Sequence, residues 1–359
     1  MRVNVPAKRK FTTFAVKMER MSRKQHILFV INPISGGTSK HLIESAIESQ
    51  MDSRKFSWRI VYTSYSGHAA VWATMAVENG WDAVVAVGGD GTINEIARSL
   101  VNSRTALGII PCGSGNGLAR HLHIPLEYRK AVDLINTYEV RAFDYGRIND
   151  QPFFCTCGMG FDAYISAKFD ASLKRGPITY LENAVREILN YKPETYILED
   201  ENGERTEHNA FLITCANASQ YGNNAYIAPK ASMDDGLLDV TIIEPFNFVE
   251  APILAIQFLN GTLPNKGNVK MFQTRWLKVL RQAEGYLHRD GDPFWGGREI
   301  LLEAVPQQLR VIVNGRAKIK PLPFLQALSI VFRNKMYSNT VLGQTIANSS
   351  REILEKLGL

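Results

Sequence analysis

The sequence contains no apolar run long enough to cross a bilayer. A spanning helix needs about 20 consecutive apolar residues, whereas segments such as Ala83–Val87 and Leu107–Pro111 have the length of buried strands. Cysteine is also scarce, with four residues in 359. Cys155 and Cys157 would point to opposite faces of a strand, so they are poorly placed to share a metal. No zinc spacing or secretory signal is recognisable, and reduced cytoplasmic thiols are expected.

Positive charge is only modestly in excess. The chain has 41 Lys and Arg against 35 Asp and Glu, which gives a net charge of +6 and a pI near 9.0. This balance fits a nucleotide, an acidic membrane surface or nucleic acid, and a solvated basic face explains it equally well. The basic residues are dispersed and have no accompanying aromatic motif, so nucleic-acid binding has little support.

Residues 1–24 have no acidic residue before Glu19 and no long apolar segment of the secretory type. A second methionine, Met21, precedes the first predicted strand. We interpret this basic stretch as an extension or an early start, and a basic arm on a membrane surface is the alternative.

From His26 onward, strand-like and helix-like segments alternate. Strands are predicted over 26–32, 56–64, 83–87 and 106–111, and helices over 39–49, 69–78, 92–101 and 116–122. This alternation is typical of parallel βαβ units in a doubly wound sheet. Ligands of such sheets lie beyond the carboxyl ends of the strands, so the glycine-rich turns that follow them are expected to converge.

After about residue 140 the sequence becomes rich in strand-like segments, and helices are predicted only over 178–190 and 249–259. The chain length favours two domains. We predict a nucleotide-binding α/β domain over 25–140 and a β-sandwich or barrel domain over 141–322. A helical tail, residues 323–359, is expected to pack back onto the first domain.

The strongest motif is Gly88–Glu95, Gly-Gly-Asp-Gly-Thr-Ile-Asn-Glu, between a buried strand and a helix start. Its glycines let backbone N–H groups approach an anion closely, and Thr92 can cap the helix and bond a phosphate oxygen. Asp90 would repel phosphates, so a metal or a substrate hydroxyl explains it better. The alternative is a tight turn with an acidic N-cap, but such a turn would not explain all eight residues of the motif.

Three further turns follow strands on the expected ligand edge. Asn32–Gly37 lacks the Gly-Lys-Ser/Thr of a P-loop, so a Walker site is not supported. Thr63 closes the second strand, and Pro111–Arg120 contains flexible glycines and a serine hydroxyl. Each turn alone could be an ordinary connection.

Asn-Pro-Ile-Ser-Gly-Gly, Gly-Gly-Asp-Gly-Thr-Ile-Asn-Glu and Pro-Cys-Gly-Ser-Gly-Asn-Gly-Leu-Ala-Arg, in this order, resemble motifs of the diacylglycerol kinase catalytic domain family, which includes bacterial lipid kinases, sphingosine kinases and ceramide kinases. The resemblance spans about residues 26–315 and continues through Gly160–Ala163, Lys174–Gly176, Ala228–Val240 and Asp290–Pro293. It implies an NAD kinase-like doubly wound α/β domain, then a β-sandwich domain, with the active site between them.

The resemblance also implies ligands. ATP would contact Asn32, Pro33, Ser35, Gly36, Thr63, Gly88, Gly89, Asp90, Gly91, Thr92, Asn94, Ser114 and Asn116. Mg²⁺ would be held by Asp235 and by the carbonyls of Ser232 and Leu237, which suits its preference for oxygen, although a hairpin turn explains the same residues. The lipid is assigned to Asp162, for which a turn residue is the alternative, and Lys174.

Three carboxylates are candidates for the catalytic base. The family offers the aspartate of the Gly-Gly-Asp loop, here Asp90, and a terminal Asp-Gly-Glu, here Asp290 and Asp292. Asp292 stands where the family commonly has glutamate, and its side chain reaches less far. Phosphoryl transfer requires mainly positioning, charge neutralisation and a carboxylate near the attacking hydroxyl.

We therefore predict an ATP-dependent, Mg²⁺-requiring lipid kinase that phosphorylates diacylglycerol or a sphingoid long-chain base. It is expected to be cytoplasmic and peripherally associated with membranes, and a homodimer is compatible with the sequence. An NAD kinase is the nearest alternative enzyme, but Ile93–Glu95 and Pro111–Arg120 resemble lipid kinases more closely. A catalytically inactive lipid-binding regulator is the alternative of another class, and the retained acidic motifs argue against it.

Overall fold

The computed structural model describes residues 23–170, 187–188, 190–247 and 250–314 of the chain. They form two compact units. The first unit contains residues 23–113, 124–141 and 309–314, and the second contains the other described residues. A single division between residues 140 and 141 would place residues 114–123 and 309–314 in the opposite units.

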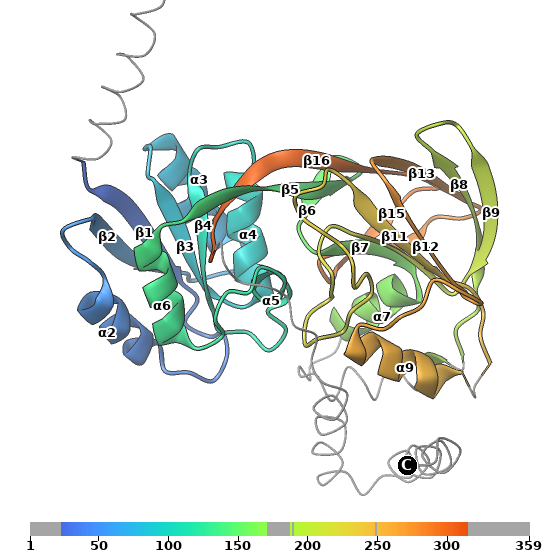
Figure 1. Ribbon diagram of the computed structural model, residues 1–359, viewed down its shortest axis with the longest axis horizontal. Coiled ribbons are helices and arrows are strands. Elements are labelled where there is room, and N and C mark those ends of the chain that lie inside the picture. Colours follow the sequence, from blue (N-terminus) through green and yellow to red (C-terminus); the bar gives the residue numbers. More distant parts are fainter. Residues whose placement is uncertain (1–22, 171–186, 189, 248–249, 315–359) are drawn as a thin grey trace, which may run out of the picture. The chain divides into compact units, whose positions relative to one another are not determined.

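The first unit is built on four parallel strands in the order β2-β1-β3-β4 (Figure 1). Their bounds are β1 Gln25–Ile31, β2 Phe56–Tyr62, β3 Ala83–Gly88 and β4 Ala106–Pro111. Every residue of β3 and β4 is buried, as expected for central parallel strands that are covered on both faces. The predicted doubly wound α/β domain is thereby confirmed.

Helices cover both faces of this sheet: α2 Lys40–Gln50, α3 His68–Glu78, α4 Asp90–Leu100 and α6 Tyr128–Thr137. Helices α2 and α6 pack together, as do α3 and α4. Alternate residues of β1, Ile27, Phe29 and Ile31, lie in one core cluster with Ile43 of α2 and Ile135 of α6. The central strands of the sheet are therefore buried on both faces, whereas the edge strand β2 is partly exposed.

The second unit is a β-sandwich. One sheet has the order β12-β11-β10-β7-β14-β15, and the strands facing it include β8, β13 and β16. The bounds are β5 Val140–Ile148, β6 Gln151–Phe153, β7 Thr156–Gly160, β8 Glu194–Asp200, β9 Arg205–Ala210, β10 Leu212–Ala216, β11 Leu238–Ile243, β12 Val269–Thr274, β13 Trp276–Arg281, β14 Gly285–Arg289, β15 Asp292–Gly296 and β16 Glu299–Ile312. Their inward side chains form a single buried apolar cluster.

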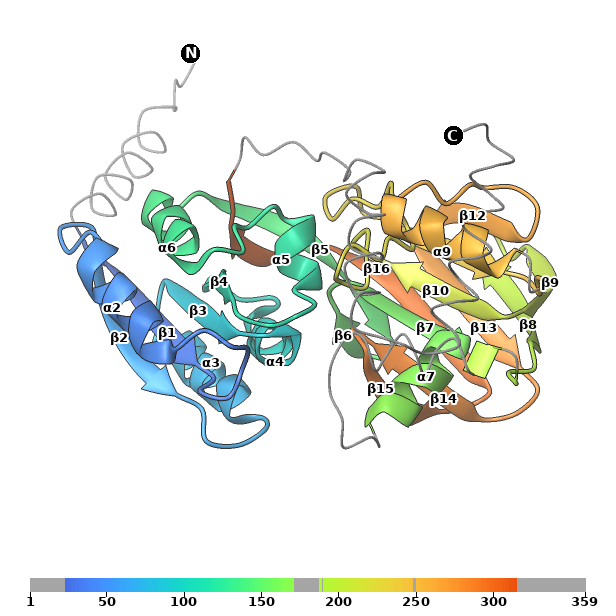
Figure 2. The ribbon, with the colours of Figure 1, turned by 90° about the horizontal axis from the view of Figure 1, so that it is seen from below.

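Two helices, α7 Phe161–Asp170 and α9 Ala251–Asn260, cover the outer face of the six-stranded sheet (Figure 2). Phe161 and Ile165 of α7 share an apolar cluster with Phe211 and Leu212, and Phe258 of α9 packs against it. The helix predicted over 249–259 is α9, whereas the one predicted over 178–190 and the tail 323–359 lie outside the described residues, apart from a few positions of the former. In the part of the chain that the structure describes, no helix is both long and apolar enough to span a membrane.

Strand β16 and helix α5 Gly117–His121 lie in different units from those that their positions in the sequence would suggest. The end of β16 pairs in parallel with β4, where Val311 lies opposite Leu107, so these residues join the first sheet. Helix α5 instead bonds to a loop of the second unit, where His121 Nδ1 lies 3.0 Å from Ser219 Oγ. Both exchanges depend on long-range pairing that no local pattern reveals.

Candidate functional site

The turns after β1, β3 and β4 are in mutual contact in the first unit. The Asn32 Nδ2 donates to Thr92 Oγ1 at 3.0 Å. A Cβ placed on Gly36 would lie 1.8 Å from the carbonyl oxygen of Cys112, and one on Gly89 would lie 3.3 Å from the Cα of Gly113. The glycine-rich turns therefore converge at the carboxyl edge of the sheet, as predicted.

The first of these turns is held by its own side chains. Ile34 N donates to Asn32 Oδ1 at 3.1 Å, and Ser35 Oγ donates to the Asn32 carbonyl at 3.0 Å. Lys40, at the start of α2, donates to the carbonyl of Ser35. Sequence reasoning did not single out Lys40, although its ammonium group lies next to a turn predicted to bind phosphate.

The second turn leads into α4. Gly89 is the N-cap residue, and Asp90 is the first helical residue. A Cβ on Gly88 would lie 2.6 Å from Thr92 Cβ, so the helix start and the strand end are closely packed. Thr92 and Asn94 are both buried. Helix N-termini attract anions through N–H groups and the helix dipole, and here an aspartate stands at the same place.

Glu95, the last residue of this motif, connects α4 to the turn before α3. Its carboxylate accepts from Gly67 N at 2.8 Å and from Ala69 N at 3.2 Å, which satisfies two N–H groups at the start of α3. Thr63, nearby in sequence, is largely buried, and its N–H donates to the Ile31 carbonyl at 2.9 Å. Sequence reasoning gave Glu95 no role, because its partners are far away in the chain.

A stack of three rings extends from this turn. The Tyr65 and His68 rings are parallel with centroids 4.4 Å apart, and His68 stacks on Trp72 at 5.5 Å. Tyr65 is 61% exposed. The stack thus ends in an accessible flat ring close in sequence to Thr63.

The remainder of the third turn belongs to the second unit. Ser114 is exposed, whereas Asn116 is buried and has a positive φ of 52° at the N-cap of α5. The Arg120 guanidinium donates from Nε to the Gly115 carbonyl at 2.9 Å. This part of the turn is therefore fixed by contacts of its own, separate from those around Gly36 and Gly89.

The two terminal carboxylates occupy different environments. Asp290, in the turn between β14 and β15, has a φ of 50°. Its Oδ1 accepts from Cys155 N at 2.7 Å and Thr156 N at 3.2 Å, and its Oδ2 accepts from Phe154 N at 2.9 Å. Asp292 begins β15 and is exposed. Asp290 therefore fixes the bend between β6 and β7, whereas Asp292 faces solvent.

Asp162 lies at the start of α7 and is 7% exposed. Its Oδ2 is 2.8 Å from Thr214 Oγ1, 3.1 Å from the Tyr221 hydroxyl and 3.0 Å from His288 Nε2. This carboxylate is thus engaged by side chains of the protein, and its assignment to a lipid acceptor stays a prediction. Lys174 lies outside the described residues.

Acidic residues gather around the predicted metal turn. Leu237 N donates to Asp235 Oδ1 at 3.0 Å, and Gln273 Nε2 donates to both Asp235 and Asp239, at 3.4 and 3.2 Å. Burial raises the pKa of Asp239 to about 6, and the charge of Asp235 adds to this. Burial also raises the pKa of Asp235, and Asp144 contributes.

The described residues contain no group of three or more His, Cys, Asp or Glu side chains placed to hold a metal by themselves. A cation at the acidic turn would therefore need backbone carbonyls and water in addition to Asp235.

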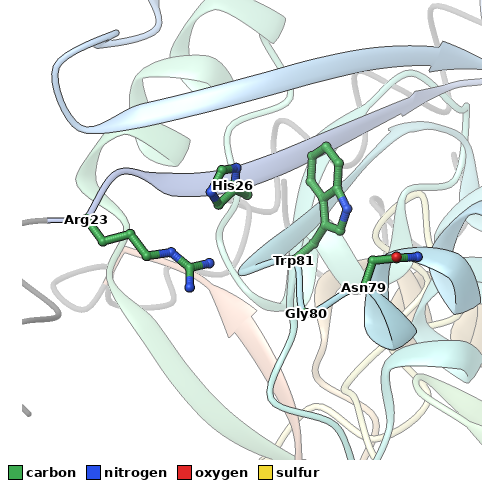
Figure 3. A pocket seen from close by; sticks show the side chains of 5 residues that line it. All are labelled: Arg23, His26, Asn79, Gly80 and Trp81. Carbon is green, nitrogen blue, oxygen red and sulfur yellow. The ribbon is translucent and has the colours of Figure 1, made fainter.

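A hollow of about 460 Å³ lies on the first unit, away from these turns (Figure 3). It is lined by Arg23, His26, Asn79, Gly80 and Trp81. These residues precede or begin β1 and β3, so the hollow is at the amino-terminal edge of the sheet. The predicted site residues take no part in it.

Replacing Gly36 by alanine should destabilise the first unit. The new Cβ would overlap the Cys112 carbonyl, and the positive φ of 62° adds strain. We expect a loss of about 2–4 kcal/mol in the free energy of unfolding, measured by urea denaturation. Gly37→Ala is the matched control, because a Cβ there meets no atom within 4 Å. Equal stability of the two variants would contradict the close contact of the turns.

Replacing Asp290 by asparagine should lower stability by about 2 kcal/mol, because an amide nitrogen would face a backbone N–H donor in place of an oxygen. Asparagine tolerates the positive φ, so the loss reports the hydrogen bonds. The Asp292→Asn variant should lose less stability than Asp290→Asn, because Asp292 is exposed. Thermal and urea unfolding of both variants measures this, and a larger loss for Asp292→Asn would reverse the assignment.

Comparison with known proteins places these features in a family. Residues 26–148 match the diacylglycerol kinase catalytic domain, and residues 155–313 match the YegS C-terminal NAD kinase beta sandwich-like domain. A Chromohalobacter salexigens protein named "Probable lipid kinase YegS-like" is 34% identical over 228 residues, which cover 62% of this chain and 73% of that protein. The "Diacylglycerol kinase" of Bacillus subtilis is 29% identical over 276 residues, covering 75% and 89% of the two chains.

A crystal structure of a diacylglycerol kinase from Bacillus anthracis superimposes with a TM-score of 0.64 at 19% identity, over 81% of this chain and 97% of that one. This likeness supports the fold. The two matched domains and the relative that is 34% identical support membership of a family as well as the fold. The matched domains coincide with the glycine-rich turns and the sandwich described above. This chain therefore belongs to the YegS-like and diacylglycerol kinase family of lipid kinases.

Proposed function

We propose that this protein transfers the γ-phosphoryl group of ATP to the hydroxyl group of a membrane lipid. The observation that carries the proposal is the meeting of three backbone turns at the N-terminus of α4, beside Asp90. Such a meeting supplies N–H groups for phosphate oxygens, and the nearby Lys40 supplies a positive charge. Family membership supports a phosphotransferase that acts on lipids.

In this proposal the triphosphate binds to the turns around Asn32, Gly36 and Gly89–Thr92, with Ser114 and Asn116 contributing from the third turn. The Thr92 hydroxyl already bonds to the Asn32 amide, so the two turns are ordered before ligand arrives. The exposed ring of Tyr65 offers a flat surface for the adenine base. Preordered turns reduce the entropy lost on binding.

Mg²⁺ fits the acidic turn of the second unit. The observation is chemical: Asp235 and Asp239 both have raised pKa values because of burial and neighbouring negative charge, so a cation would stabilise their ionised forms. Asp235 and the carbonyls of Ser232 and Leu237 would hold the ion with water. When bound, Mg²⁺ would supply positive charge that offsets the charge of phosphates.

The carboxylates have separate roles in the proposed reaction. Asp90, the first residue of α4, would contact a metal or the acceptor hydroxyl beside the phosphates. Asp292 is the exposed carboxylate able to approach an acceptor hydroxyl, and Asp290 holds its turn in place through three backbone N–H groups. Positioning and electrostatic stabilisation provide most of the rate enhancement in phosphoryl transfer, so the loss of a positioning group is also costly.

We further infer that the acceptor is diacylglycerol or a sphingoid long-chain base, met at a membrane surface by a peripherally bound enzyme. Relatives named as diacylglycerol kinases favour the first acceptor. The Gly-Ser-Gly-Asn-Gly-Leu-Ala string of the third turn favours the second acceptor, because it resembles the corresponding string of sphingosine and ceramide kinases more than that of bacterial diacylglycerol kinases. An assay panel that includes both lipid classes distinguishes them.

Replacing Asp90 by asparagine should reduce turnover at least about 100-fold and leave the fold intact, because the carboxylate that would contact a metal or the acceptor hydroxyl is replaced by a neutral amide of the same shape. Transfer of radiolabelled phosphate from ATP onto diacylglycerols, sphingoid bases, ceramide and NAD measures this. Asp133→Asn, an exposed carboxylate of α6, is the control and should retain full activity. Wild-type labelling of NAD alone would replace the lipid kinase proposal by an NAD kinase.

Replacing Asp239 by asparagine should change how stability depends on pH. Because its pKa in the folded protein, about 6, lies above the ordinary 3.8, the neutral form favours folding and this advantage is lost as pH rises through 6. Wild type and Asp239→Asn should be equally stable near pH 4, and the variant should be more stable by about 1–3 kcal/mol at pH 7.5.

Urea unfolding at the two pH values measures the difference, with Asp133→Asn as a control that should follow the wild type. Millimolar Mg²⁺ should narrow the difference at pH 7.5 by stabilising the ionised wild type. A difference of the same size at both pH values would contradict the role of Asp239 ionisation, and insensitivity to Mg²⁺ would contradict the metal assignment.

A further inference from the structure

A buried cluster of polar side chains in the second unit is centred on Asp162. The Tyr221 hydroxyl lies 2.6 Å from Thr214 Oγ1 and donates to Asp162 Oδ2 at 3.1 Å. The same oxygen is 3.0 Å from Nε2 of His288, which is 1% exposed. A Cβ on Gly158 would lie 2.4 Å from this oxygen, so the cluster occupies space that a side chain there would fill. The Tyr221 ring is thus fixed at its hydroxyl end.

The backbone of the same tyrosine packs against the third glycine-rich turn. A Cβ on Gly117 would lie 3.1 Å from the Tyr221 carbonyl oxygen, and a Cβ on Gly222 would lie 3.1 Å from the Cα of Gly115. Asn223 N donates to the Gly115 carbonyl at 3.1 Å. Residues 221–224 and 115–117 are therefore in backbone contact, with glycine on both sides.

Two side chains reinforce this contact. Arg120 donates from Nε to the Gly115 carbonyl at 2.9 Å and from Nη1 to Asn224 Oδ1 at 3.3 Å. His121 Nδ1 lies 3.0 Å from Ser219 Oγ in a buried site, and burial lowers the pKa of this imidazole to about 4. Helix α5 is thereby held by neutral and charge-assisted bonds to the segment that carries Tyr221.

We infer that Tyr221 is a positioning residue for the nucleotide. Its hydroxyl, anchored at Asp162 in the sandwich, holds residues 221–224, and these hold the turn from which Ser114 and Asn116 reach the ligand. The inference rests on the proposed ATP binding by this turn. Asp162 then acts through Tyr221, and this assigns a function to a buried carboxylate whose Oδ2 is engaged by three side chains of the protein.

The Tyr221→Phe variant tests the inference with little change of shape. Loss of the hydroxyl bonds should loosen residues 221–224 and raise KM for ATP about five- to tenfold, the size expected for one buried hydrogen bond, while kcat changes less than twofold. Tyr196→Phe is the matched control, because its hydroxyl bonds to Glu194 at 3.2 Å in the same unit without contacting the turn. It should leave KM for ATP unchanged.

Hydrogen exchange provides a readout that requires no activity. The amide of Asn223 donates to Gly115, so its exchange in the ligand-free protein should be faster in Tyr221→Phe and unchanged in Tyr196→Phe. Asn224→Gly removes the amide acceptor of Arg120 and keeps the positive φ of 61°, so it should raise KM for ATP in the same direction.

Unchanged exchange at Asn223 in Tyr221→Phe would overturn the anchoring role. Faster exchange with an unchanged KM for ATP would overturn the link to nucleotide binding. A wild type that transfers no phosphate from ATP to any lipid would instead refute the proposed function, and the exchange experiment would still decide whether Tyr221 anchors the turn.

Discussion

The close approach of three backbone turns, made by glycines at positions 36, 88 and 89, is the constraint on which the rest of the candidate site depends. A side chain at Gly36 would overlap the backbone after β4, and one at Gly88 would overlap Thr92. Because strands β1, β3 and β4 are parallel and buried on both faces, their carboxyl ends meet at one edge. Because glycine has no side chain, the backbone N–H groups at this edge are accessible to a ligand.

The first unit could be predicted well from the sequence, since its signals are local. Buried strands of about six apolar residues alternate with amphipathic helices, and the glycines stand directly after the strands. Helix α6 is not among the predicted helices, although Glu127 caps it and its apolar residues follow a helical period. The helix lies just before the expected domain boundary at residue 140, where the sequence changes from helix-like to strand-like segments.

The rest could not be predicted because it depends on contacts far apart in the chain. Glu95 caps a helix that starts 27 residues earlier in sequence, at His68, and neither partner has a distinctive local pattern. Helix α7 begins at Phe161, directly after β7, and no turn-rich interval in the sequence marks the change from strand to helix. The assignment of residues 114–123 to the second unit requires knowledge of the loop around Ser219 and Asn223.

The acidic residues illustrate how similar motifs diverge in physical role. Asp290 and Asp292 are separated by one glycine, yet one carboxylate accepts three backbone N–H groups and the other is exposed. A positive φ at Asp290 turns its side chain back toward the bend that follows β6, and β15 begins only at Asp292. A carboxylate used to hold a turn is bound before any substrate arrives. Asp290 therefore holds the turn through hydrogen bonds to the backbone, and this turn sets the position of the exposed Asp292 carboxylate.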